Sequence, residues 1–372
     1  GDFGCNIIYT AMSAFLLFSV PASWASTPKL VYVFITYNLV STVIYTAINV
    51  PYSALNALMT QDPYERSVLS IFRNLLATAG TLTINTFTLP LVEYFGNNAA
   101  AWTKTFVVFG FVAIAAFLCT FFGTKERVRA AENEGEVQTE DVPFVTGIKA
   151  LFKNKYWVIV TVASFVVFFV IIMYAMGNVY YCQYVLYDMG QYSWVSNSIS
   201  IAQFAVMFVT PAFMKKFGKT AVYEAGMVVM GLGFLGFAVL GGSSTIVMII
   251  CNVLKGCGVG MAGGMALGMV ADTITYGTKK TGIDTVGLGN AGVSAAQKIG
   301  LGLGTAVFGW VLNGAGYDGS LDAQGIAQPE SVSTAINFLY NWLPFIMVIA
   351  IFVLMVILYH CERDLKKMEA AE

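Results

Sequence analysis

Ten long apolar runs limit what this chain can fold into. A helix needs about 20 apolar residues to cross roughly 30 Å of hydrocarbon. The expected spans are residues 3–20, 29–58, 68–95, 102–123, 155–182, 194–217, 220–241, 245–274, 286–314 and 333–359. Hydrophobic residues make up 57% and charged residues 11% of the chain, whereas soluble domains have about 45–50% and about 25%. The sequence therefore predicts an all-α integral membrane protein, a bundle of about ten transmembrane helices.

A charged segment divides the predicted spans into four and six. Residues 125–143 read KERVRAAENEGEVQTEDVP, and such a density of charge is typical of a solvated linker. We therefore expect a shortened N-terminal bundle over residues 1–123. A charged cytoplasmic linker over residues 124–153 should follow, and then a C-terminal bundle of six helices over residues 154–372.

Basic residues are distributed unevenly between the predicted loops. Cytoplasmic loops of membrane proteins carry an excess of lysine and arginine. With Gly1 on the inner side, fifteen of the 20 lysine and arginine residues fall in inner loops, and only Lys29 and Lys104 fall in outer loops. Both termini are therefore expected to be cytoplasmic.

Several function classes find no support in the residues. The net charge is −1 without blocks of like charge, so no nucleic-acid partner is expected. The six cysteines show no CxxC spacing, and we predict neither a disulfide nor a metal site. The chain has a single histidine, His360, and no paired carboxylates inside its spans. We therefore predict no catalytic residue and no enzyme, and expect small solutes and lipid as partners.

Lys298 is the first candidate binding residue. It lies in the middle of the apolar, glycine-rich segment TVGLGNAGVSAAQKIGLGLG, residues 285–304. An ionised side chain at bilayer depth costs ~2.5–3.5 kcal/mol on insertion scales, so it should face a partner or a wet cavity. The glycines around it and in the preceding span repeat every four residues, as at Gly260 and Gly264 or Gly300 and Gly304. This spacing favours close helix packing, with hinge or substrate-lining roles as the alternatives.

Three further polar residues lie inside predicted spans of the first half. Thr46 and Asn49 lie about one turn apart just before Pro51, where either a simple proline kink or a polar site lining would explain them. Asn6 in the first span raises the same alternatives. Each is a candidate for contact with a polar solute.

Charged residues within or near the spans raise similar alternatives. Arg73 either snorkels to the membrane interface or offers its planar donors to a solute. Asp272 and Tyr276 either belong to a solvated helix end or form a gate with a salt bridge. Lys255 is expected to be an internal partner of other helices, without an assigned role.

Two adjacent segments resemble a known family. The segments ADTITYGTKKTG and AAQKIGLGLGTAVFGWVL closely resemble the helix X to XI signature of the glycoside-pentoside-hexuronide:cation symporters. That family is related to melibiose permease and belongs to the major facilitator superfamily. INVPYSALNALMTQDPYERSVLSIFR is similar to its helix IV to V region, and GDFGCNIIYT is similar to its helix I start.

The resemblance implies a secondary active transporter that carries a sugar or sugar acid with a cation, Na⁺ or H⁺, by alternating access. By position it implies substrate binding at Asn6, Asn49, Arg73 and Lys298, and cation binding at Thr46 and Asn49. It also implies gating at Asp272 and Tyr276. We expect a monomer in the cytoplasmic (inner) membrane of a bacterium, without a cofactor.

One departure from the family pattern affects this expectation. The superfamily has two halves of six helices each, whereas the linker here divides four spans from six. LLFSVPASW, residues 16–24, resembles the end of helix III directly after a helix I start, so helix II and parts of helices I and III are expected to be missing. Helix II carries the family's cation-binding acids. A binding-only remnant that does not transport, and a lipid or lysolipid carrier of the same superfamily, are therefore the alternatives.

Overall fold

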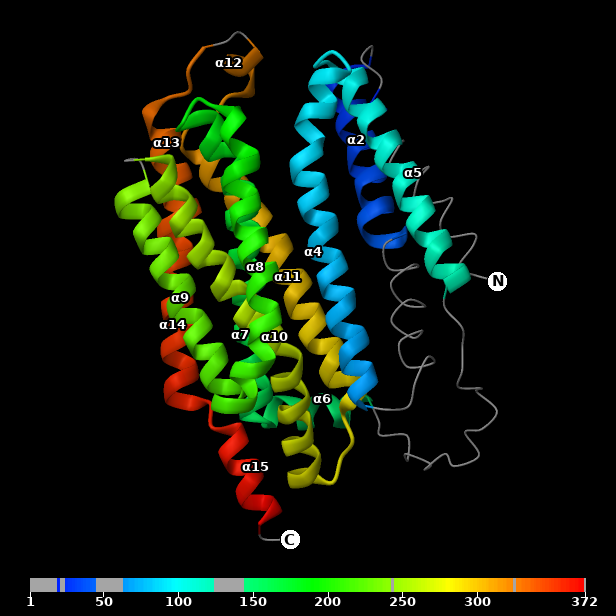
Figure 1. The fold of residues 1–372 in the computed structure, drawn as a ribbon, viewed down its shortest axis with the longest axis vertical. Helices are drawn as coiled ribbons and strands as arrows, with labels where there is room; N and C mark the ends of the chain where they lie inside the picture. Colours follow the sequence, from blue (N-terminus) through cyan, green and yellow to red (C-terminus); the bar gives the residue numbers. More distant parts are fainter. Residues whose placement is uncertain are drawn as a thin grey trace. The chain divides into compact units, whose positions relative to one another are not determined.

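A computed structural model of the chain describes residues 19–20, 24–44, 63–123, 144–241, 244–323 and 326–370. The chain divides into two compact units, Gly1–Val137 and Gln138–Glu372, and each is described here by itself. All regular secondary structure in the described residues is helical (Figure 1). This confirms the predicted all-α class.

The N-terminal unit contains four described helical elements. Helix α2, Ser26–Asn38, continues into the π-helical turn η1, Leu39–Ile44, and α4, Pro63–Tyr94, is followed by α5, Ala99–Gly123. The connection between α4 and α5 is tight: Gly96 has φ 105°, a conformation that favours glycine. The Asn98 side chain then accepts a hydrogen bond from Ala101 N at 2.9 Å, which caps the start of α5.

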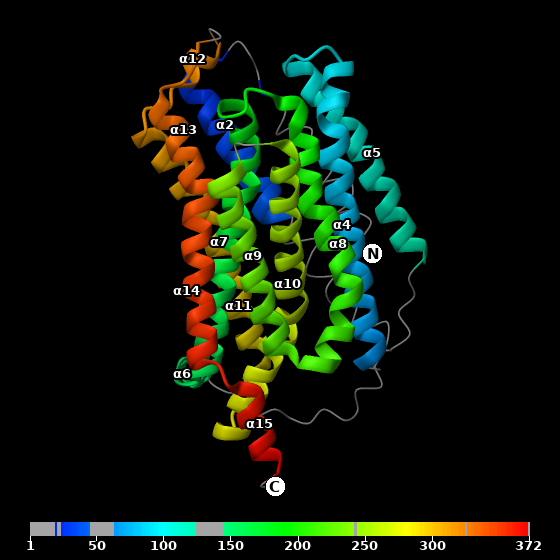
Figure 2. The ribbon, with the colours of Figure 1, turned by 60° about the vertical axis from the view of Figure 1, so that its left-hand side comes forward.

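The C-terminal unit is an up-and-down bundle with short helices at both ends (Figures 1 and 2). Its elements are α6 Phe144–Lys153, α7 Lys155–Tyr184, η3 Met189–Gln191, α8 Tyr192–Phe217, α9 Lys219–Leu240, α10 Thr245–Thr281, α11 Val286–Gly314, α12 Gly319–Ala323, α13 Glu330–Asn337, η5 Phe338–Trp342, α14 Leu343–Leu358 and α15 Cys361–Glu369. We refer to the two ends of this bundle as the α12 end and the α15 end.

Seven stretches of the described residues are long and apolar enough to cross a membrane. They are Ala100–Thr120, Lys155–Tyr184, Met189–Phe217, Lys219–Leu240, Thr245–Thr281, Val286–Gly314 and Glu330–Met368. They match the last seven of the ten predicted spans. The predicted span 68–95 lies within a single helix, α4, of 32 residues, while residues 3–18 and 45–58 of the first two predicted spans lie outside the described residues.

Residues 144–153 of the predicted linker form a helix, α6. Its sequence FVTGIKALFK buries Gly147, Ala150 and Leu151, while Lys153 at its last turn is exposed. A lysine there interacts favourably with the negative end of the helix dipole. The linker prediction overlooked this short helix because the charged stretch before it dominates the segment.

Small residues allow the helices of the C-terminal unit to pack closely. Helix α10 packs against α9 and α8, α11 packs against α7, and α14 packs against both α9 and α7. A Cβ added at Gly258 of α10 would collide with Met230 and the Gly226 carbonyl of α9, and one added at Gly300 of α11 would collide with the Phe165 carbonyl of α7. Close helix packing at the glycine repeats is therefore confirmed for Gly300.

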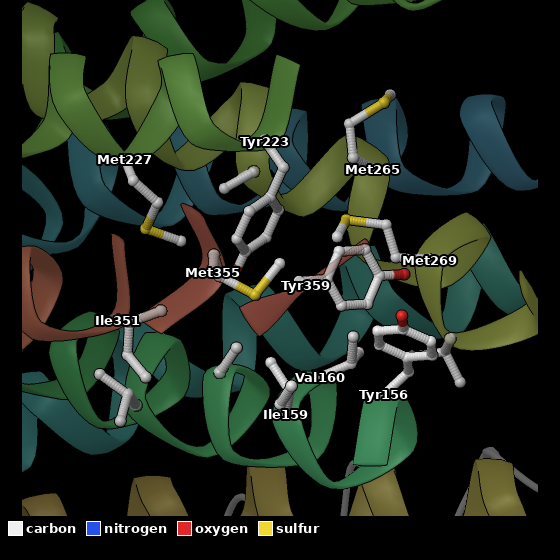
Figure 3. Packing of buried hydrophobic residues seen from close by; sticks show 14 of the residues in the cluster. Tyr156, Ile159, Val160, Tyr223, Met227, Met265, Met269, Ile351, Met355 and Tyr359 are labelled. Atoms are coloured by element: carbon white, nitrogen blue, oxygen red, sulfur yellow. The ribbon is translucent and has the colours of Figure 1, made fainter. Parts of the chain in front are cut away.

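Methionine and tyrosine side chains fill the core near the α15 end. Figure 3 shows Met227, Met269 and Met355 from three different helices in one cluster with Tyr156 and Tyr359. Met355 is fully buried. Flexible thioether side chains fill irregular gaps between helices and contact aromatic ring edges favourably, so the helices can pack here despite uneven side-chain shapes.

The start of α7 is tied to α10 through one side chain. Asn154 caps α7, because its Oδ1 accepts hydrogen bonds from the backbone N–H groups of Tyr156 and Trp157 at 3.2 and 3.3 Å. Its Nδ2 donates to the Thr273 carbonyl of α10 at 2.7 Å. One amide thereby satisfies helix-end donors and fixes the position of α7 against α10.

Candidate functional site

Four of the predicted site residues belong to the N-terminal unit. Asn6, Thr46 and Asn49 lie outside the described residues, so their roles stay predictions. Arg73 lies in α4, and the structure describes its backbone but not its side chain. The remaining predicted residues, Lys298, Asp272 and Tyr276, belong to the C-terminal unit.

Lys298 lies on a polar stripe that runs along α11. The exposed residues Ser294, Lys298, Thr305 and Asn313 fall within an arc of about 100° around the axis at 3.6 residues per turn, so they share one side of the helix. Gly302 and Gly309 lie on the same side, and no atom of the described residues lies within 4 Å of a Cβ added at either position. We call this surface the α11 polar stripe.

Two other faces of α11 have different surroundings. Gly300, Gly304 and Phe308 are buried against α7. Ile299, Leu303 and Trp310 are exposed by 61%, 41% and 67% and lie on a third face, suited to lipid. Because lipid suits only the large apolar face, the polar stripe is the side of α11 that can line a water-filled path.

At the α15 end, Asp272 of α10 forms a salt bridge with α9. The Nζ of Lys219 lies 2.8 Å from both carboxylate oxygens of Asp272, and the two side chains are 33% and 21% exposed. Lys219 is the first residue of α9, directly after Gly218, whose φ of 86° ends α8. The pair therefore connects the start of α9 to the last turns of α10.

The short helix α15 completes this group of contacts. Glu362 accepts hydrogen bonds from the backbone N–H of Lys219 at 3.0 Å and of Thr220 at 3.3 Å, so a carboxylate caps the positive end of α9. The Tyr156 hydroxyl of α7 donates to Asp364 of α15. Helices α7, α9, α10 and α15 are therefore joined by charged and polar groups at one end of the bundle.

Tyr276 belongs to the same region but has different partners from Asp272. It is 8% exposed, and its ring lies 4.9 Å from the Tyr156 ring in an edge-to-face arrangement. Lys280, one turn later, donates to its hydroxyl at 3.4 Å. Asp272 fixes α10 to α9 and Tyr276 fixes α10 to α7, so the two predicted gating residues hold the same helix end from two sides.

The α12 end carries a different polar network around one carboxylate. Asp322 of α12 accepts hydrogen bonds from the hydroxyls of Tyr184 and Tyr317, the latter at 3.0 Å, and from Gln328 Nε2 at 2.8 Å. Burial opposes ionisation of Asp322, but the three donors outweigh it and lower the pKa of this carboxyl. These hydrogen bonds hold α12 against the end of α7. They were not predicted from the sequence.

Lys255 of α10 is fully buried and was given no role by the sequence. Its Nζ lies 4.7, 4.1 and 4.2 Å from the ring centroids of Phe234, Phe237 and Tyr340, and it donates to Asn341 Oδ1 at 3.2 Å. We call this group the Lys255 cage. Each desolvated aromatic face contributes about 2 kcal/mol to binding a cation, whereas burial of the charge costs several kcal/mol. The two effects are of similar size.

Among the described residues, no group of three or more His, Cys, Asp or Glu side chains could hold a metal ion. The polar groups instead gather in the α11 polar stripe, the two helix-end networks and the Lys255 cage. Apart from Lys298, Asp272 and Tyr276, the residues of these groups were not singled out as site residues from the sequence. A lysine inside an apolar span indicates a functional site. This pattern identified Lys298, whereas Lys255 was expected only to be an internal partner of other helices.

Comparison with known proteins adds a family and a fold. A family model described as MFS/sugar transport protein matches residues 5–363. The isoprimeverose transporter of Lactiplantibacillus pentosus is 30% identical over 344 residues, which cover 90% of this chain and 68% of that protein. An Escherichia coli (strain K12) protein named as a candidate glycoside/cation symporter is 26% identical over 332 residues, with 88% and 69% covered.

The solved structure of a major facilitator superfamily transporter, FucP, in the outward conformation, is also similar. It superposes with a TM-score of 0.57 at 14% sequence identity, covering 95% of this chain and 82% of that one. At this identity the likeness concerns the fold alone. The chain spans about two thirds of the length of the two relatives named above.

Proposed function

The chain belongs to the MFS/sugar transport protein family, and we propose that it carries a sugar or glycoside together with a cation across the membrane by alternating access. The predicted resemblance to sugar:cation symporters is confirmed at the level of the family. With seven helices among the described residues that are long and apolar enough to span a bilayer, the chain is a multi-pass membrane protein. Its own substrate and coupling ion are part of the proposal.

The α11 polar stripe is the observation that carries this proposal. Hydroxyls, an amide and one ammonium group, with glycines between them, suit the hydroxyl-rich surface of a sugar, because each can donate to or accept from a hydroxyl. A lipid carrier would need apolar groups along such a path. In this proposal Lys298, Arg73, Asn6 and Asn49 bind the substrate.

Thr46 and Asn49 are proposed to contribute oxygen ligands for the coupling cation. Their hydroxyl and amide oxygens are suited to a small alkali cation, but neither carries a negative charge, so the cation would be held weakly by them alone. The cation is Na⁺ or H⁺ in this proposal. Coupling to Na⁺ predicts uptake driven by a Na⁺ gradient, and coupling to H⁺ predicts uptake driven by a pH gradient. The assay below distinguishes the two cases.

We propose that the α15 end faces the cytoplasm of a bacterium and that the protein lies in the inner membrane. In the C-terminal unit, the α15 end carries Lys149, Lys153, Lys155, Lys215, Lys216, Lys219, Lys279, Lys280, Arg363, Lys366 and Lys367. The connections at the α12 end, residues 185–191, 241–244 and 315–329, contain no lysine or arginine. An excess of basic residues marks the cytoplasmic side.

Asp272 and Tyr276 are proposed to act at the cytoplasmic gate. Their contacts to Lys219 and Tyr156 hold the last turns of α10 against α9 and α7. A rocking motion of one half against the other exposes the site alternately, and such a motion requires that helix ends move together as rigid groups. We infer that these two residues keep that end of α10 with its own unit.

An uptake assay tests the function. Purified protein in proteoliposomes is given radiolabelled glycosides and pentosides under a Na⁺ gradient, a pH gradient, or neither, and internal sugar is measured. Accumulation of at least one sugar above the external concentration under one gradient is the expected result. Absence of both accumulation and exchange would refute the proposal, and measurable sugar binding without any transport would select the binding-only alternative.

A further inference from the structure

The Lys255 cage lies within the membrane-spanning part of α10. Lys255 is ten residues after Thr245, where α10 begins, which corresponds to about 15 Å along the helix axis. That is about half of the ~30 Å hydrocarbon thickness. The cage therefore places an amino group near the middle of the bilayer and away from the α11 polar stripe.

In the described part of the chain, one hydrogen-bond acceptor contacts this amino group. Asn341 Oδ1 accepts from Nζ at 3.2 Å, and three ring faces surround the rest of the group. Among the described residues, no carboxylate forms an ion pair with Lys255. The other titratable groups near the cage are thiols and phenols: Cys251 one turn earlier on α10, Tyr340 in the cage itself, and Tyr181 and Cys182 of α7 behind it.

Such surroundings accept both forms of the amino group. An ammonium is stabilised by the ring faces, while a neutral amine needs no compensation for a buried charge. Asn341 Oδ1 accepts a hydrogen bond from either form, so loss of the proton leaves the contact in place. A lysine paired with a carboxylate would instead be fixed in the charged form.

Two of the groups around Lys255 come from one short element that is separate from α9 and α10. Tyr340 and Asn341 both belong to η5, Phe338–Trp342, which is a π-helical turn between α13 and α14. Such turns are rare and occur frequently at functional sites. A shift of η5 against α10 would remove the acceptor and one of the three rings from Nζ together, and would change which form of the amino group is favoured.

Polar contacts hold η5 in its present position. The Tyr340 hydroxyl donates to Asn178 of α7 and lies 3.4 Å from Asn252 Oδ1 of α10. Asn341 donates in turn to Asn337 Oδ1 at 2.8 Å. The orientation of the cage therefore depends on the packing of η5 against α7, α10 and α13.

We propose that Lys255 is a proton-binding site that gains and loses one proton as the bundle changes conformation. The role of Lys255 in coupling rests on the proposed function. The inference assigns H⁺ as the ion that binds at this site. The proton binds the amine lone pair to give the ammonium, and no other bond changes. Conformation alters the affinity of the cage for that proton, and by linkage the proton alters the balance of conformations.

The protonation state can be measured without transport. Protein labelled with ¹³C at the lysine ε-carbon is titrated across the pH range in which it stays folded, and the Lys255 resonance is identified by its loss in Lys255→Arg. The expected result is movement of that resonance between the ammonium and the amine positions. A resonance that stays at the ammonium position throughout overturns the proposal.

Transport then tests the coupling. Lys255→Met replaces the amino group with a side chain of similar length that binds no proton, and Lys255→Arg keeps a permanent charge. For both variants, the ratio of pH-gradient-driven accumulation to sugar exchange should fall about tenfold or more. Lys366→Met, which removes an exposed lysine of α15, is the control and should keep the wild-type ratio.

The two hypotheses fail in different ways. A wild-type protein that neither exchanges nor accumulates any sugar refutes the proposed function, and the resonance of Lys255 still decides whether the site titrates. A wild-type ratio in both Lys255 variants, or accumulation that follows the Na⁺ gradient alone, overturns the assignment of H⁺ to this site.

Discussion

The Nζ of Lys219 lies 2.8 Å from both carboxylate oxygens of Asp272, joining residues that are 53 positions apart in the sequence. Both side chains retain partial exposure. Water therefore weakens the attraction, but the geometry is bidentate. The pair links the beginning of α9 to the final turns of α10, where Glu362 already caps α9.

Removal of this pair should cost little stability but should be measurable as a coupling. Lys219→Met and Asp272→Asn should each lower the thermal unfolding midpoint, and the double variant should lose less than the sum of the two. A coupling energy of about 0.5–1 kcal/mol is expected for a partly exposed pair. Strictly additive losses in detergent at low salt would mean that the two groups do not interact in solution.

Lys298 should be required for substrate binding. Lys298→Ala removes the ammonium from the α11 polar stripe and should reduce sugar binding, measured by isothermal titration, at least about tenfold, as expected for loss of a charged hydrogen bond. Ile299→Ala is the matched control, because the neighbouring Ile299 lies on the exposed apolar face. Equal effects of the two changes would show that Lys298 contributes only to the stability of the helix.

Glycine substitutions on α11 should distinguish its packed face from its open one. A Cβ at Gly300 would collide with the Phe165 carbonyl of α7, whereas a Cβ at Gly302 would have no neighbour within 4 Å in the part of the chain that the structure describes. Gly300→Ala should destabilise the protein by about 1–3 kcal/mol, as overpacking does. Gly302→Ala should be neutral or stabilising by up to about 1 kcal/mol, because alanine favours the helix. Thermal unfolding of the two variants side by side provides the measurement, and a reversed order would contradict the packing of α11 on α7.

Asn154 should contribute through two separable hydrogen-bonding roles. Asn154→Asp keeps an acceptor for the N–H groups at the start of α7 but loses the donor to the Thr273 carbonyl, whereas Asn154→Ala loses both. Loss of an N-cap costs about 1 kcal/mol, so the alanine variant should unfold at a lower temperature than the aspartate variant. Equal midpoints would show that the cap contributes nothing measurable.

Acidification should loosen the α12 end. The pKa of Asp322 is lowered in the folded protein because, despite its burial, hydrogen bonds from Tyr184, Gln328 and Tyr317 stabilise the carboxylate. A lowered folded-state pKa gives stability that is present above the ordinary aspartate pKa of about 3.9 and is lost as the pH falls through the folded value. Protection of residues 315–323 against hydrogen exchange, taken relative to the intrinsic exchange rate at each pH, should therefore fall below about pH 4 in the wild-type protein.

The matched variant for that experiment is Asp322→Asn, which cannot ionise. Its protection against hydrogen exchange in the same segment should be lower than that of the wild type near neutral pH and nearly independent of acid. If the wild-type protein and the variant respond to acid in the same way, the Asp322 network does not hold α12 in place.

The sequence predicted the helical class and the positions of seven described spans because each apolar run is a local property of about 20 residues. Lys298 was found for the same reason, as one charge in an apolar run. Its neighbours on the stripe were not, because Ser294 and Thr305 are small and the glycines between them conceal the period. Only the burial pattern separates the three faces of α11.

Contacts between distant segments could not be predicted from one sequence. A salt bridge at Asp272 was one of two alternatives, but its partner Lys219 lies on another helix. The Lys255 cage is assembled from α9, α10 and η5, and no spacing along the chain joins those segments. The helix α6 was missed because a charged stretch beside a short amphipathic segment is typical of a linker.

The separate faces of α11 have a consequence for how this protein can diversify. Substitutions at the exposed residues Ser294, Thr305 or Asn313 change groups outside the face that packs on α7, so they can accumulate without loss of folding. At Gly300 and Gly304 almost no larger side chain fits. A selection for growth on a new sugar should therefore enrich changes at the first set of positions and leave the second intact. The packing of α11 can therefore stay constant while the polar groups on its exposed side change.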